Sequence, residues 1–334
     1  MSRQRTIDTH THIITEDTIR LLQAAAPSLG ISLKTNDADT ATLRAGDTVY
    51  PDFPTGGFDV ARRLRDMDDA DVDVQVLSVT PTTYLYKQDA ALCAATSVIQ
   101  NDQLARLIAA HPARFMAIGT LPMQDPKRAA DELRRCMTQL RLSGAMIASN
   151  VAGTNLDDPN LEPVWATAEE TGALMYIHPY HVAAADRLKS YYLGNLIGNP
   201  LDTTIAAACL IFGGVMQRHP KLKVCLSHGG GFTPYQAARW EHGWAVRPEA
   251  KKHLKEQPRN IVGQFFYDTI LHSDRTLRGL IDLAGASRVL LGSDYPYDMA
   301  MMDCVRHVRS LALPRADEDR ILGGHAETLL AGTA

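Results

Sequence analysis

The sequence predicts an α/β protein, and more specifically a distorted (β/α)8 TIM barrel with an insertion after its first strand. Short apolar runs such as DVQVLSV and LMYIHP alternate along the chain with segments of helical pattern, and this composition is typical of parallel strands covered on both faces. Eight such runs occur in 334 residues, a length that one barrel domain commonly reaches. A doubly wound open sheet is the alternative, but the glycines of HGGGF do not form the GxGxxG pattern that would favour it.

The predicted strands and helices follow one another in a regular order. A helix over residues 125–140 begins with Asp125 as N-cap and Pro126 at the first helical position, where proline is favoured. A second helix over residues 160–172 ends at Gly172, a typical helix stop. The eight predicted strands are residues 6–13, 73–79, 115–122, 145–149, 174–179, 223–228, 265–270 and 288–294.

Two stretches interrupt this alternation. Residues 15–57 are rich in Thr, Asp, Gly and Pro and predict an insertion over the barrel mouth. Residues 186–200 predict a long connection after the fifth strand. Because no linker, repeat or low-complexity tract separates the chain into parts, we expect residues 1–334 to form a single domain.

Charge and cysteine content narrow the classes of function. A net charge of −4 gives no electrostatic footprint for nucleic acid or an anionic membrane. No secretory signal and no window of 18 uncharged apolar residues is visible, so we expect no membrane span. The five cysteines are scattered without a CxxC pair, which favours a reducing cytoplasm over a disulfide framework. The sequence therefore predicts a cytoplasmic protein that acts on small molecules.

Five histidine and aspartate side chains fall at the ends of predicted strands. His10 and His12 lie two apart in the first strand, where both side chains point to the same side. His178, His228 and Asp294 end the fifth, sixth and eighth strands. Each alone has an ordinary structural explanation, as a solvated, core or capping residue. Together they open onto the C-terminal rim of a barrel, and imidazoles with one carboxylate suit zinc, iron, manganese or cobalt.

The motifs DTHTH, IHP, SHGGG and GSDYP, in this order, resemble the amidohydrolase superfamily. GTLPMQDP, FGGVMQRHPKLKVCLSHGGG and GGHAETLL resemble more closely its branch that contains 2-amino-3-carboxymuconate-6-semialdehyde decarboxylase. The resemblance implies one divalent ion, foremost Zn²⁺ with Mn²⁺, Fe²⁺ or Co²⁺ as alternatives, and His228 as general acid and base. It also implies a homodimer, because Arg239 matches an arginine that binds substrate carboxylate from the neighbouring subunit. The implied metal ligands are His10, His12, His178 and Asp294.

The sequence departs from this branch in its implied substrate-binding residues. Tyr50 stands where a second carboxylate-binding arginine is expected, and Arg44 is the nearest arginine. Tyr192 stands where the branch has a tryptophan beside the active site. Because losing one arginine removes a bidentate carboxylate clamp, a ring acid with one carboxylate and an adjacent hydroxyl would fit a pocket containing Tyr50, Tyr192 and Arg239.

We therefore predict a metal-dependent, non-oxidative decarboxylase of a small hydroxylated aromatic or heteroaromatic carboxylic acid, or of a muconate-semialdehyde-type acid. Two routes stay open. In one, His228 deprotonates metal-bound water that adds to the substrate; in the other, the metal binds carboxylate and hydroxyl directly, and Asp294 or His228 protonates the ring carbon.

Other functions must be weighed against the same residues. A one-metal hydrolase of an amide or lactone, or a hydratase, would use a similar site. A two-metal hydrolase is disfavoured because the strand-four run SGAMIASN contains no lysine. A non-catalytic binding barrel is disfavoured because all five polar groups are present.

Overall fold

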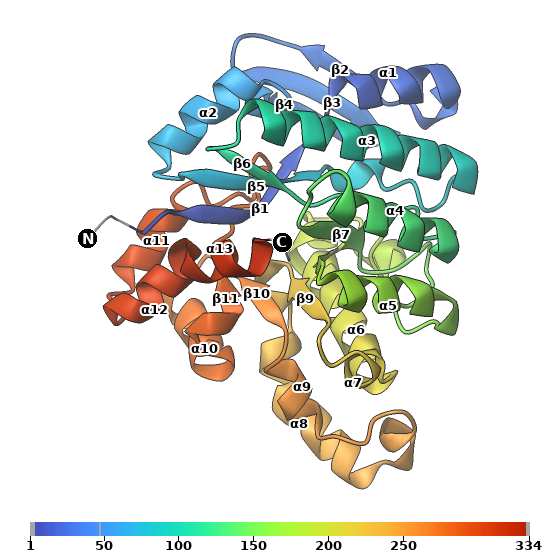
Figure 1. The fold of residues 1–334 in the computed structure, drawn as a ribbon, viewed down its shortest axis with the longest axis vertical. Coiled ribbons are helices and arrows are strands. Elements are labelled where there is room, and N and C mark those ends of the chain that lie inside the picture. The colour runs from blue at the N-terminus through green and yellow to red at the C-terminus, as the bar shows by residue number, and fades with distance from the viewer. Residues whose placement is uncertain (1–3, 47, 332–334) are drawn as a thin grey trace.

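The computed structural model describes residues 4–46 and 48–331. Both ends of the predicted domain, residues 1–3 and 332–334, therefore lie outside the described residues. Within these ranges, eight strands pair in parallel and alternate with helices (Figure 1). The predicted α/β fold with parallel strands is confirmed. The parallel strands are β1 (Ile7–Ile13), β5 (Val74–Val79), β6 (Phe115–Ala117), β7 (Gly144–Ala148), β8 (Leu174–His178), β9 (Lys223–Leu226), β10 (Phe266–Asp268) and β11 (Val289–Leu290).

The parallel strands form two arcs, β1-β5-β6 and β11-β10-β9-β8-β7. Single backbone bridges join the arcs on both sides, from Gly119 to Ala145 and from Thr11 to Tyr295. At these junctions the strands are shorter than predicted: β6 is shorter than the predicted strand 115–122, and β11 is shorter than the predicted strand 288–294. β11 pairs with β10 only at Val289 and Leu290, and Asp294, the predicted end of the eighth strand, has a left-handed backbone (φ 65°) that a strand cannot contain. The arrangement is that of a distorted barrel.

The helices begin and end largely where local sequence signals place them. The Asp125 side chain accepts from the backbone N–H of Arg128 and caps α4, with Pro126 at its first turn. Gly172 ends α5 in the left-handed conformation (φ 68°), as predicted. The helices are α1 (Glu16–Ala25), α2 (Val60–Asp69), α3 (Ala90–Ala110), α4 (Pro126–Thr138), α5 (Glu162–Thr171), α6 (Asn199–Phe212), α7 (Val215–Arg218), α8 (Thr233–Val246), α9 (Pro258–Val262), α10 (Asp274–Ala284), α11 (Cys304–Ser310), α12 (Arg315–Asp319) and α13 (His325–Leu330).

Residues 15–57 contain α1 and an antiparallel sheet of strands β2 (Ser32–Thr35), β3 (Thr40–Ala45) and β4 (Thr48–Pro54). The end of this insertion is fixed to β1 by Arg63 of α2, a side chain that is fully buried. Its guanidinium donates to the carbonyl oxygens of Gly56 (3.0 Å) and His12 and lies 4.7 Å from the centre of the Tyr295 ring. Arg63 therefore ties the insertion to the backbone of β1.

The connection at residues 186–200 is partly helical, which the sequence did not indicate. A π-helical turn over Gly194–Gly198 runs directly into α6. By length and composition, Gly194–Phe212 could span a membrane. A single such helix is weak support for that reading, because its buried Asp202 accepts hydrogen bonds from the Asn150 side chain (2.9 Å) and from the backbone N–H of Ala183 (2.9 Å). These bonds place α6 within the polar network of the fold.

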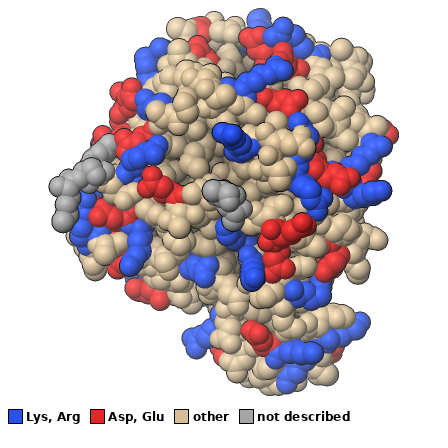
Figure 2. Space-filling view, viewed as in Figure 1, with Lys and Arg blue, Asp and Glu red and all other residues tan. Residues whose placement is uncertain are grey.

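Charges of both signs are interspersed on the face shown in Figure 2, which displays no extended field of one sign. Helices α8 and α9 extend away from the rest of the molecule at the bottom of Figure 1. Each carries one exposed arginine, Arg239 on α8 and Arg259 on α9.

Candidate metal centre and active site

Four of the predicted site residues converge in the structure. The ligating atoms of His10, His12, His178 and Asp294 all lie within 4.8 Å of one another, and all four residues are buried. The Nε2 atoms of His10 and His12 are 3.1 Å apart. Asp294 Oδ1 lies 3.4 Å from the first of these atoms and 3.2 Å from the second. Strands β1 and β8 and the segment after β11 supply these side chains.

Hydrogen bonds fix the imidazole tautomers in the form that a metal requires. His12 Nδ1 lies 3.1 Å from the Val79 carbonyl, and His178 Nδ1 lies 3.0 Å from the Pro179 carbonyl. A carbonyl oxygen only accepts, so each Nδ1 carries the hydrogen and each Nε2 presents a lone pair. His10 Nδ1 likewise contacts Asp268 Oδ2 at 2.8 Å. Three lone pairs therefore face one point.

The buried atoms at this point fit a bound cation. Within the described part of the chain, His178 Nε2 and Asp294 Oδ1 are buried without a hydrogen-bond partner, and such buried polar atoms are costly when unpaired. Two facing imidazole lone pairs at 3.1 Å also repel unless a positive charge lies between them. The donor set therefore fits a divalent ion such as zinc.

The pKa shifts of three of the four residues agree with this ligand set. The exception is His10: burial would lower its pKa, but the hydrogen bond to Asp268 and the charge of Asp294 outweigh burial and raise that pKa. Burial lowers the pKa of His12 and lowers that of His178 much further, where the neighbouring imidazoles add to the effect. Burial alone would raise the pKa of Asp294, but the neighbouring histidines outweigh it and hold that pKa well below its ordinary value. Two neutral imidazoles and an ionised carboxylate are the forms in which these residues bind metals.

Asp268, at the end of β10, organises the residues around the cluster. Its carboxylate accepts from the backbone N–H groups of His228 (2.9 Å) and Gly229 (2.8 Å) as well as from His10. This geometry requires the SHGGG turn, in which His228 and the following glycines all have positive φ. A Cβ on Gly231 would lie 2.2 Å from the Pro200 carbonyl oxygen, so only glycine fits there.

His228, the predicted general acid and base, lies beside the cluster. Its Nε2 lies 3.4 Å from Asp294 Oδ2, and its Nδ1 is buried with no hydrogen-bond partner in the described ranges 4–46 and 48–331. The side chain lines both cavities that reach the cluster. An imidazole in this position can hold or release a proton at a bound ligand.

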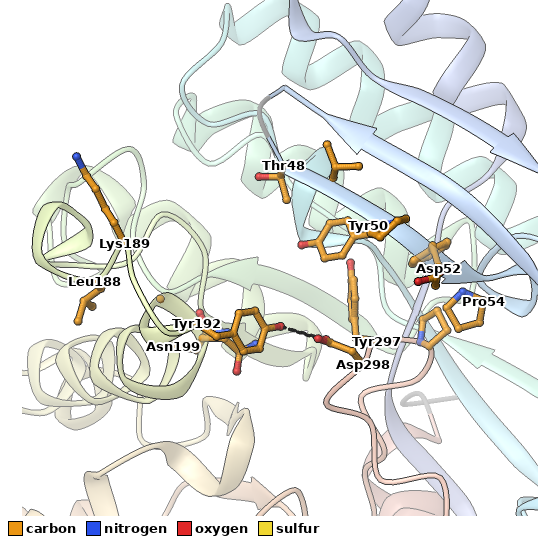
Figure 3. Close-up of a pocket in the computed structure, with 16 residues that line it drawn as sticks. Thr48, Tyr50, Asp52, Pro54, Leu188, Lys189, Tyr192, Asn199, Tyr297 and Asp298 are labelled. Carbon is orange, nitrogen blue, oxygen red and sulfur yellow. Dashed lines mark hydrogen bonds between the residues drawn. The ribbon is translucent and has the colours of Figure 1, made fainter. Parts of the chain in front are cut away.

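Two adjoining cavities of about 310 and 320 Å³ reach the cluster, and both are lined by His228 and Asp294. The cavity of about 310 Å³ opens toward an outer groove of about 750 Å³ with which it shares Tyr50, Tyr192, Tyr297 and Asp298. Figure 3 shows Tyr192 and Asp298 pointing toward one another, with Tyr50 and Tyr297 beside them.

The sequence model of the family described as Amidohydrolase matches residues 7–331, nearly the whole chain. The chain belongs to the amidohydrolase family.

Three similar proteins place this amidohydrolase among decarboxylases. It is 35% identical over 328 residues to the 2-amino-3-carboxymuconate-6-semialdehyde decarboxylase of Dictyostelium discoideum, with 97% of this chain and 91% of the relative covered. It is 28% identical over 299 residues to the gamma-resorcylate decarboxylase of Polaromonas sp., with 85% and 91% covered. The solved structure of 5-carboxyvanillate decarboxylase from Sphingomonas paucimobilis matches with a TM-score of 0.86 at 30% identity, covering 99% and 100% of the two chains. These relatives are carboxy-lyases, and the chain groups with them by sequence and by fold.

The predicted substrate-binding residues of this amidohydrolase lie in different places. Tyr50 of β4 lies with its ring centre 5.7 Å from that of Tyr297. Tyr192, in the connection after β8, donates to Asp298. Arg44 of β3 and Arg239 of α8 are exposed and do not line the cavities at the cluster. The structure thus brings the two tyrosines together at the site but neither arginine.

Sequence reasoning missed three residues of the amidohydrolase site. Asp268 could have been noticed as the one carboxylate in the strand-like run FFYDTI. Tyr297 follows Asp294 by three residues, and its ring centre lies 5.2 Å from that of His12. Its hydroxyl pairs with that of Thr80. No sequence signal marks Asp298, whose position depends on how two distant loops meet.

Proposed function

We propose that this amidohydrolase is a non-oxidative decarboxylase of a small aromatic acid that carries one carboxylate and an adjacent hydroxyl. One observation carries the proposal. The buried histidine and aspartate cluster lies at the end of a cavity of about 310 Å³, which is at the lower limit of ordinary ligand pockets. The tyrosines Tyr50, Tyr180, Tyr192 and Tyr297 line that cavity and offer aromatic walls to a ring.

The charges around the cavity support a substrate with a single carboxylate. Of the described residues that line the two cavities at the cluster, none is a lysine or an arginine. A carboxylate that leaves water needs a compensating positive charge. The charge available from this chain's own cavity is the ion that His10, His12, His178 and Asp294 would hold. When bound there, such an ion would supply the positive charge that polarises a substrate carboxylate and a neighbouring hydroxyl.

The reaction then depends on proton delivery by the chain. His228 lines the cavity beside Asp294 and gives a proton to the ring carbon that bears the carboxylate. A C–H bond forms, the bond to the carboxylate breaks, and its electron pair restores the aromatic ring as carbon dioxide leaves. The imidazole regains its proton from solvent. Tyr50 and Tyr297 hold the ring in place. The similarity to two kinds of decarboxylase supports this reaction over hydrolysis or hydration.

The experiment that tests this function combines metal analysis with carbon dioxide release. We expect the purified protein to contain one divalent ion per chain, zinc by preference over manganese, iron or cobalt, and to release carbon dioxide from hydroxybenzoates or hydroxypyridine carboxylates. His12→Ala should lose both metal and activity. His228→Asn should keep the metal but lose about a hundredfold or more in kcat. His253→Ala, an exposed histidine outside the cluster, is the matched control.

Two outcomes would redirect the proposal. Turnover of the semialdehyde substrate alone would favour the hydration route and a dicarboxylic substrate. Bound metal without carbon dioxide from any acid would favour a one-metal hydrolase or a hydratase.

The proposal extends to the assembly. Arg239 is exposed on α8 and does not line the inner cavities of its own chain. An arginine that contributes to the active site of a neighbouring subunit must be exposed in this way. We propose a homodimer on this basis. A cytoplasmic location and the absence of nucleic-acid or membrane partners stay predictions.

A further inference from the structure

We infer that Asp298, with Tyr192, selects substrates that carry a hydrogen-bond donor on the side of the ring remote from the reacting carboxylate, and disfavours a second carboxylate there. The donor would be a hydroxyl or amino group. This inference rests on the proposed function and assigns the substrate class of the same site more narrowly.

The position of Asp298 is the first part of the argument. Asp298 lines both the outer groove and the inner cavity, and the inner cavity also contains His178, His228 and Asp294. A ring acid whose carboxylate lies at the cluster therefore directs its opposite edge toward the mouth of this cavity. Figure 3 shows the Tyr192 and Asp298 side chains meeting at that mouth.

The hydrogen bonding of Asp298 is the second part. The Tyr192 hydroxyl donates to Asp298, at 3.1 Å from Oδ1 and 3.0 Å from Oδ2. A carboxylate has about four acceptor positions, so one hydroxyl leaves most of them free. Across residues 4–46 and 48–331, no lysine or arginine forms an ion pair with Asp298, and Lys189, which lines the same outer groove, points away from it in Figure 3. The carboxylate is therefore a negatively charged acceptor with room for a ligand's donor.

The field of Asp298 reaches across the mouth. Burial raises the pKa of Tyr50 and of Tyr192, and the charge of Asp298 raises both further. Both phenols consequently stay neutral. Asp298, Tyr50 and Tyr192 line the same mouth, so the negative charge lies beside the space between these rings, where the outer edge of a substrate ring would lie.

The two ends of the cavity thus have opposite charge preferences. The cluster has one carboxylate, that of Asp294, so with a divalent ion bound it would carry a net positive charge. It would then attract the carboxylate of the substrate. The mouth is negative and favours a donor, whereas a second carboxylate there would face a like charge. A dicarboxylic acid therefore fits this cavity less well than a hydroxylated monocarboxylic acid.

The test compares salicylate with derivatives that carry a second hydroxyl or a second carboxylate, placed meta or para to the reacting carboxylate. We expect the wild-type protein to prefer the best hydroxyl derivative over the matching carboxyl derivative in kcat/KM. Asp298→Asn, which keeps the side-chain size, should reduce that preference by about tenfold or more. Tyr192→Phe should have a smaller effect in the same direction, because the carboxylate remains. Asp303→Asn, an exposed carboxylate on the same segment outside the cavities, should leave the preference unchanged.

Calorimetry with the phenol products gives a second readout that does not need turnover. Phenols with a second hydroxyl should bind wild-type protein more tightly than phenol itself, and Asp298→Asn should remove the difference. An unchanged substrate ranking and unchanged phenol binding in Asp298→Asn would overturn the inference, even if the enzyme decarboxylates ring acids. If no ring acid is decarboxylated, the proposed function fails, and the calorimetric comparison alone decides on Asp298.

Discussion

At the scale of single residues, the site depends on Asp268, which positions the candidate metal ligand His10, as much as on the candidate ligands themselves. Asp268 is fully buried, and its pKa is lowered because hydrogen bonding and the charges of His10 and His228 outweigh the effect of burial. It fixes the His10 tautomer and anchors the turn that presents His228. The candidate metal ligand His10 and the proposed proton donor His228 are therefore positioned by one carboxylate, an arrangement typical of histidine metal sites.

Asp268→Asn should weaken metal binding and proton transfer together. The amide can donate to His10 Nδ1 and so favour the wrong tautomer, which turns the Nε2 lone pair into an N–H. We expect metal affinity to fall about 10- to 100-fold, measured by competition with a chelator. Added metal should restore occupancy but only part of kcat, because the His228 turn is also affected. Asp274→Asn, an exposed carboxylate, should change neither quantity.

At the scale of elements, a partly exposed charge cluster around the buried His219 joins α5 to the turn before β9, at the end of the fold opposite the active site. His219 contacts Glu162 Oε1 at 2.8 Å and Glu169 Oε2 at 3.1 Å through its two ring nitrogens. Glu162 also accepts from Arg218 (2.9 Å), and Glu169 from the backbone N–H of Lys221 (2.8 Å). This cluster fixes where β9 begins, and thereby where His228 lies at the end of that strand.

This cluster predicts a loss of stability in acid. Burial would raise the pKa of Glu162, but hydrogen bonds from Arg218 and His219 outweigh it and lower the pKa; the Lys221 N–H and His219 lower that of Glu169. The stabilisation is complete above the ordinary value of 4.5 and is lost as the pH falls through the lower folded-state values. Urea denaturation between pH 6 and about pH 3 should show a steeper decline in wild-type protein than in a Glu162→Gln/Glu169→Gln variant. Equal slopes would contradict the assignment.

At the scale of the whole molecule, the sequence predicts what local pattern controls and misses what distant contacts control. The order of strands follows from apolar runs, and the metal ligands follow from their places at strand ends. Strands β6 and β11 are shorter than predicted because the junctions between the arcs consist of single bridges, such as that from Gly119 to Ala145. Asp268 and Asp298 were missed because a lone aspartate acquires its role only from partners 258 and 106 residues away.

The proposed assembly can be tested by mixing two defective proteins. Arg239→Ala and His228→Asn should each be inactive alone. After subunit exchange, a hybrid dimer would contain one site with an intact His228 and an intact Arg239 of the partner subunit. We expect roughly a quarter of wild-type activity to return. Subunit exchange can be verified by mass measurement of tagged chains. If exchange occurs and no activity returns, Arg239 acts within its own chain or has no part in catalysis.

The buried Arg63 has a consequence for how such an enzyme can change. It holds the end of the insertion, at Gly56, against the backbone of the ligand His12, and it packs on Tyr295 beside Asp294. The segment upstream of this anchor, including Tyr50, can vary in sequence and length while the ligands stay in register. Sequence changes in the insertion can therefore alter which substrates bind, while the residues of the candidate metal site keep their positions.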